Sequence, residues 1–143
     1  MRILLFVALA LLLSSFAPAH LPPQGGAKLA LLKYSGGGDW YAVVDALQNL
    51  AKFCNDNLGT NFDVEYATVD VGSPDIFNYP FLFMTGHGNV VFSDAEAENL
   101  RTYLIGGGFL FIDDDYGMEP YARVAIKKVF PDRGLIQLPF EHP

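Results

Sequence analysis

The sequence has a single cysteine, Cys54, among its 143 residues. An intrachain disulfide and a metal site built from several cysteine thiolates are therefore excluded. Basic residues are also scarce, with 9 Lys and Arg against 16 Asp and Glu, and the formal net charge is −7. Because binding of nucleic-acid phosphates needs patches of Lys and Arg, we do not expect a nucleic-acid partner. Hydrophobic residues make up 51% of the chain, which excludes an intrinsically disordered protein.

A long apolar run occurs only at the N-terminus, between Ile3 and Leu13. It is shorter than the roughly 20 apolar residues that a membrane-spanning helix needs. Arg2 precedes the run and Ala17-Pro-Ala19 follows it, which is typical of a secretory signal peptide. We therefore expect residues 1–19 to be a signal peptide, and the mature protein to be periplasmic or extracellular without a membrane span. An uncleaved anchor is the alternative interpretation.

The remainder of the chain reads as a short linker, residues 20–27, and one domain, residues 28–143. Apolar and β-branched runs predict strands at 28–34, 62–71, 79–85, 109–112 and 135–138. Helical spacing of apolar residues predicts helices at 40–58, 93–105 and 119–130. This alternation predicts an α/β fold, a three-layer flavodoxin-like parallel sheet with strand order 2-1-3-4-5.

The sequence ends at Pro143, directly after the last predicted strand. A doubly wound sheet usually continues into another helix, so we expect the domain to be truncated at its C-terminus. The outer edge of the fifth strand would then be open, which allows self-association through that strand.

Two helix starts carry local signals. Ser93-Asp-Ala-Glu96 is a capping box, in which the Ser93 hydroxyl and the Glu96 carboxylate satisfy each other's backbone amides. Asp39 precedes the predicted helix 40–58 and is a candidate N-cap. Cys54 lies on the apolar stripe of that helix, which favours a structural role over a nucleophilic one.

Polar and glycine-rich segments follow three of the predicted strands: Ser35–Asp39, Gly86–Asn89 and Asp113–Tyr116. The carboxyl ends of parallel strands meet at one edge of the sheet, and ligands bind there where the strand order reverses. The three segments therefore predict a ligand site. Its candidate binding residues are Ser35, Gly36, Gly37, Gly38, Asp39, Trp40, Gly86, His87, Gly88, Asn89, Asp114, Asp115 and Tyr116.

Several of these residues have a structural alternative. The three glycines of Ser35–Asp39 could cradle an anion or simply form a flexible turn. Trp40 could floor a pocket for a sugar ring or pack on the core. Asn89 could bind a ligand or adopt a left-handed turn conformation. Within Asp113–Asp115, one carboxylate could cap the next helix while another faces solvent.

The candidate catalytic residues are His87, Asp113 and Asp114, because a histidine and neighbouring carboxylates can transfer protons or attack a substrate. A divalent cation on the carboxylates is an option for such a hydrolase. No Walker A loop, dinucleotide fingerprint or G-x-S-x-G elbow is present. We assign no cofactor and no metal ligand from the sequence.

Five segments resemble an uncharacterised exported bacterial family, domain of unknown function 4159: Tyr34–Tyr41, Phe77–Pro80, Met84–Ser93, Ala97–Leu100 and Gly107–Gly117. The resemblance extends over the whole mature chain. It implies a fold similar to the class I glutamine amidotransferase-like superfamily, and a chain that continues beyond Pro143.

The resemblance does not imply amidotransferase chemistry. That superfamily places a nucleophilic cysteine after the strand that corresponds to Phe109–Ile112, where this chain has Asp113–Asp115. Its oxyanion loop would match Gly86–Gly88, and its late His-x-Glu pair would fall near His142-Pro143. Glutaminase activity is therefore not expected.

Three functional hypotheses follow. The first is an exported domain that binds a small polar ligand, for example a carbohydrate, at the carboxyl edge of the sheet. The second is a hydrolase that uses Asp113–Asp115 and His87, with or without a metal ion. The third is a partner-docking domain with an exposed apolar patch at its open sheet edge.

Overall fold

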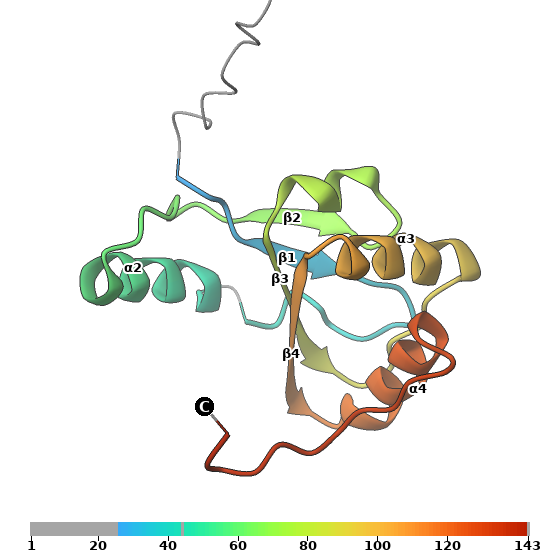
Figure 1. Ribbon diagram of the computed structural model, residues 1–143. Helices are drawn as coiled ribbons and strands as arrows, with labels where there is room; N and C mark the ends of the chain where they lie inside the picture. The colour runs from blue at the N-terminus through green and yellow to red at the C-terminus, as the bar shows by residue number, and fades with distance from the viewer. Residues whose placement is uncertain (1–25, 44, 143) are drawn as a thin grey trace, which may run out of the picture.

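The computed structural model describes residues 26–43 and 45–142. The predicted signal peptide and most of the predicted linker lie outside these ranges. The described chain forms an α/β fold on a four-stranded, all-parallel sheet of order β2-β1-β3-β4 (Figure 1). The strands are β1 (Ala30–Lys33), β2 (Ala67–Asp70), β3 (Phe81–His87) and β4 (Phe109–Tyr116). This order confirms the first four positions of the predicted flavodoxin-like sheet.

Helices cover the sheet on two sides and make three layers. They are α2 (Ala46–Leu58), the short 3₁₀ helix η1 (Pro74–Asn78), α3 (Asp94–Ile105) and α4 (Glu119–Val129). Helices α3 and α4 lie together on one face, whereas α2 lies on the other (Figure 1). None of the helices in the described ranges combines the length and the apolar content needed to span a membrane.

Successive side chains of the central strands point to opposite faces of the sheet, and this explains why both strands are unbroken apolar runs in the sequence. On β3, Leu82 and Met84 pack with α3 and α4, whereas Phe83 packs with α2. On β1, Leu32 and Leu31 divide in the same way. Since successive side chains of a strand point to opposite faces, a strand covered on both faces needs an apolar residue at every position.

The capping box at α3 is confirmed. The Ser93 Oγ accepts a hydrogen bond from the Glu96 amide at 3.2 Å, and the Glu96 Oε2 accepts one from the Ser93 amide at 2.6 Å. Both donors belong to the helix N-terminus and have no partner within the helix. The local pattern therefore determines where α3 begins.

The predicted start of the helix at 40–58 is wrong. Helix α2 begins at Ala46 with Asp45 at its N-cap, and residues 40–42 form a turn. Asp39 is not a helix cap, although its backbone carbonyl accepts a bond from the Ala42 amide at 2.8 Å. Its side chain is engaged by the distant residue His87, and this long-range contact replaces the expected local one.

The predicted fifth strand is also wrong. Residues 134–139 pair with no strand of the described sheet, so β4 is an edge strand in the part of the chain that the structure describes. Leu135, Ile136 and Leu138 are exposed. A four-residue run followed directly by Pro139, which lacks an amide hydrogen, offers few ladder hydrogen bonds to offset the entropy lost on ordering it.

Candidate functional site

The fold brings the three polar segments together at the carboxyl edge of the sheet. Two of them are joined by backbone hydrogen bonds: the Val91 amide donates to the Ser35 carbonyl at 2.8 Å, and the Gly38 amide donates to the Asn89 carbonyl at 3.0 Å. The loop after β1 therefore lies directly against the loop after β3. These contacts form between the ends of β1 and β3, where the order in which strands are added to the sheet reverses.

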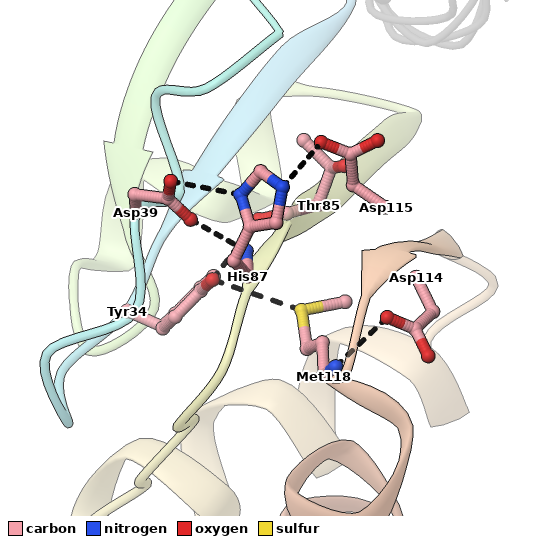
Figure 2. Close-up of polar contacts among 7 residues, drawn as sticks. All are labelled: Tyr34, Asp39, Thr85, His87, Asp114, Asp115 and Met118. Atoms are coloured by element: carbon pink, nitrogen blue, oxygen red, sulfur yellow. Dashed lines mark hydrogen bonds and ion pairs between the residues drawn. The ribbon is translucent and has the colours of Figure 1, made fainter.

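His87, the last residue of β3, is held between two carboxylates (Figure 2). Its ring Nδ1 lies 2.9 Å from the Asp39 Oδ2, and its backbone amide donates to the Asp39 Oδ1 at 2.5 Å. Its Nε2 lies 3.1 Å from the Asp115 Oδ2. The three side chains come from the β1 loop, β3 and β4, and all are partly open to solvent.

These contacts favour the charged forms of both partners. The hydrogen bond to Asp39 raises the pKa of His87, and the negative charges of Asp39, Asp115 and Asp114 add to the rise, whereas desolvation opposes it. The backbone and ring hydrogen bonds from His87 lower the pKa of Asp39. A protonated imidazole can donate from both nitrogens at once, which matches a carboxylate on each side.

The three consecutive aspartates lie inside β4, not in a loop after it as predicted. Asp113 pairs with Thr85 and Asp114 pairs with Gly86, and the register then shifts so that Tyr116 lies opposite His87. Asp115 is the extra residue of this irregularity, and its carboxylate reaches the His87 ring. Bulges of this kind often redirect a side chain beside a site.

Asp114 has a structural role. Its Oδ1 accepts a hydrogen bond from the Met118 amide at 2.8 Å (Figure 2). Its Oδ2 accepts one from the Glu119 amide at 3.1 Å. These amides belong to the start of α4, where backbone donors lack helical partners. The interpretation that one carboxylate of the cluster caps the next helix is therefore confirmed for Asp114, while Asp113 is exposed.

The sequence profile of the family described as "Domain of unknown function (DUF4159)" matches residues 28–143. The chain belongs to this family. No curated protein matches it significantly. The family resemblance drawn from the sequence is thus confirmed, whereas the relation to amidotransferase-like proteins and the export of the chain stay predictions.

Tyr34 contacts residues of β3 and of the start of α4 beside the DUF4159 site, and it was not among the predicted site residues. Its buried hydroxyl donates to the Thr85 carbonyl at 3.0 Å and lies 3.7 Å from the Met118 sulfur (Figure 2). Burial, and secondarily the negative charge of Asp39, raises the pKa of Tyr34 to about 12. The signals in the sequence were its position at the end of the predicted strand 28–34, directly before the glycines, and its place in the segment Tyr34–Tyr41 that resembles the family.

Gly86 allows the close approach on which this arrangement depends. Its φ of +137° is a conformation that side chains disfavour, and a Cβ there would lie 2.5 Å from the Tyr34 hydroxyl and 2.9 Å from the Asp39 carbonyl oxygen. Only glycine fits between these two groups. The glycine before His87 therefore serves packing within the site.

The remaining predicted site residues lie in other surroundings. Trp40 is partly buried and packs against core residues on both faces of the sheet, in agreement with the alternative that it packs on the core. Ser35, Gly36 and Gly37 form an exposed loop, and Tyr116 is 80% exposed. The left-handed alternative for Asn89 is wrong, because no non-glycine residue in the described ranges has a positive φ. Gly88, with φ +74°, takes that conformation instead.

Metal-binding groups do not converge in the part of the chain that the structure describes. No set of three or more His, Cys, Asp and Glu side chains there is placed to hold a metal ion. The chemistry that the described DUF4159 site offers consists of two partly exposed carboxylates at Asp113 and Asp115, and an imidazole whose two nitrogens both face carboxylates.

Proposed function

We propose that this DUF4159 domain is an exported binding domain that holds a small polar ligand at the carboxyl edge of its sheet, and that it has no glutaminase activity. The observation that carries the proposal is His87, fixed between Asp39 and Asp115 where three chain segments meet. Ligand sites of open α/β sheets form at this edge, next to the switch in strand order.

Binding is favoured over hydrolysis by the state of His87. A general base must be unprotonated and must face its substrate, whereas His87 is bonded to carboxylates at both nitrogens and its pKa is raised. Asp114, another of the three predicted catalytic residues, accepts hydrogen bonds from the amides at the start of α4. The hydrolase hypothesis would need His87 to leave Asp115 first.

We expect no glutaminase activity because the end of β4 carries aspartates and no cysteine. The position where amidotransferase-like proteins carry their nucleophile is occupied by Asp113–Asp115. The single cysteine of the chain, Cys54, lies on α2. Export is supported by the leader-like pattern of residues 1–19.

The charges at the site indicate which class of ligand it can bind. Asp113 and Asp115 offer acceptor oxygens, and the acidic groups at the site outnumber its one histidine. A ligand that donates hydrogen bonds, such as a neutral carbohydrate or an ammonium group, therefore fits better than an anion.

An NMR titration tests the proposal. Glucose, N-acetylglucosamine and ethylammonium chloride are added separately to the ¹⁵N-labelled protein, and at least one should shift the backbone amides of His87, Asn89 and Asp115. Asp115→Asn should weaken that binding, whereas Asp56→Asn on the exposed side of α2 removes the same charge and should not. If no probe moves these amides, the proposed function is wrong.

A further inference from the structure

An apolar groove lies on the same side of the sheet as α2. Four phenylalanine rings from β3 and β4 stack along it, with centroids 5.5 Å apart for Phe81 and Phe109 and 6.0 Å apart for Phe83 and Phe111. The volume is about 380 Å³, and every lining residue is apolar: Ala46, Leu47, Leu50, Phe81, Phe83, Phe109 and Phe111. Phe109 and Phe111 are 56% and 47% exposed, so the groove is open to solvent.

Strand register connects this groove to the polar site. Phe81 lies opposite Phe109, Phe83 opposite Phe111, and Thr85 opposite Asp113. Since alternate residues of a strand point to the same face, the next side chain on the groove side after Phe111 is Asp113. Asp115 follows in the irregular part of β4, and its carboxylate contacts the His87 ring. The strand register therefore places Asp113 next to the phenylalanines, and the His87–Asp115 pair lies directly beyond it.

An unpartnered hydroxyl lies at the junction. Thr85, on the groove side of β3, is fully buried, and its Oγ1 has no hydrogen-bond partner among the described residues. A buried hydroxyl without a partner is unfavourable, and a polar group that moved in between the rings and the carboxylates would relieve it. This observation places an unsatisfied polar group beside Asp113, the partner of Thr85 in the register of β3 and β4.

We propose that the groove and the acidic edge form a single site for an amphipathic cation, with a hydrocarbon body on the four phenylalanines and an ammonium group at Asp113 and Asp115. This inference rests on the proposed function and names its ligand class. Ligand sites commonly combine a mostly apolar cavity of about 300–1,000 Å³ with a few converging polar groups. The acidic end complements a cation and disfavours an anion of the same shape.

A second copy of the chain is a less suitable occupant. Each copy carries a formal net charge of −7, and a face-to-face dimer on this surface would bring the Asp113 and Asp115 carboxylates of both copies close together. A small cation is attracted by the same field.

The test is a homologous series of butyl-, hexyl- and octylammonium chloride, measured by calorimetry and by NMR on the whole protein. Each methylene group that is buried in the groove should tighten binding about fourfold. Octyl sulfate, with the same chain and an anionic head, should bind much more weakly. Shifts should appear at the amides of both Phe111 and Asp113.

Two variants test where the hydrocarbon body and the ammonium group of the ligand bind. Phe109→Ser should reduce the dependence of affinity on chain length, and Asp113→Asn should weaken all three amines by a similar factor. Phe77→Ser is the matched control, because Phe77 is 50% exposed on η1 and does not line the groove.

The outcomes separate this inference from the proposed function. Amines that bind at His87 and Asp115 with no chain-length dependence would overturn the groove and leave the proposed function standing, as would a sugar that binds when no amine does. Equal binding of octyl sulfate would overturn the cationic head group. A dimer that Phe109→Ser converts to a monomer, with no amine binding, would show that a second copy fills the groove. If no probe binds, both proposals fail.

Discussion

The Asp39 carboxylate accepts a hydrogen bond from the His87 backbone amide and faces the His87 ring nitrogen at 2.9 Å, although the two residues are 48 positions apart in the chain. This pair joins the loop after β1 to the end of β3. It fixes the orientation of the ring, so that the opposite nitrogen faces Asp115 on β4.

Replacement of Asp39 should change the titration of His87. In Asp39→Asn, the main hydrogen bond and charge that raise the pKa of His87 are lost, so this pKa should fall toward the ordinary histidine value. The ring resonances of His87, followed by NMR as a function of pH, measure it. Asp56→Asn is the control for a general change of net charge, and equal shifts in the two variants would show that Asp39 has no specific effect.

Stability should depend on pH through His87. Because its pKa is higher in the folded than in the unfolded state, its contribution is fully present below the ordinary histidine pKa of about 6.5 and is lost as the pH rises through the raised value. Asp39 acts in the opposite sense, because its lowered pKa contributes stability that is lost under acidic conditions. Thermal melts of wild type and His87→Gln across neutral pH should therefore converge as the pH increases. Parallel curves would contradict this coupling.

Asp114→Ala should destabilise the protein by roughly 1 kcal/mol, which is the usual cost of removing a helix N-terminal cap. The substitution leaves the amides of Met118 and Glu119 without their carboxylate acceptor. Asp113→Ala, one position away on β4, removes the same charge without removing a cap and should have a smaller effect. Urea unfolding of both variants measures the difference, and equal free energies of unfolding would argue against a capping role.

Gly86→Ala should be more damaging than Gly88→Ala. Both glycines have a positive φ, but an added Cβ at Gly86 would meet Tyr34 and Asp39, whereas none of the described atoms lies within 4 Å of the corresponding position at Gly88. Strain of this kind costs of order 1–3 kcal/mol before the clash is added. Thermal unfolding of the two variants, with the His87 titration as a second readout, tests it. A Gly88→Ala variant as unstable as Gly86→Ala would contradict the packing argument.

The features predicted well from the sequence are those that neighbouring residues decide. The Ser93 capping box is complete within four residues, and the apolar run before His87 follows from burial on both faces of a parallel sheet. The meeting of three polar segments followed from topology alone, since parallel strands end at a common edge.

The features that were missed depend on distant partners. Asp39 has the local surroundings of a helix cap, but His87 lies within reach only after the sheet has formed. Aspartate is disfavoured in strands, yet pairing with Thr85 and Gly86 extends β4 through Asp113 and Asp114. In both cases tertiary contacts override a local preference.

The central proposal is that His87 is held between Asp39 and Asp115 with a raised pKa, and that this edge of the sheet binds a ligand rather than acting as a base. The ¹⁵N chemical shifts of the two His87 ring nitrogens at neutral pH test it most directly. We predict that both nitrogens carry a proton in the wild type, and that Asp39→Asn reduces the protonated fraction. A neutral ring with one unprotonated nitrogen at neutral pH would contradict the account.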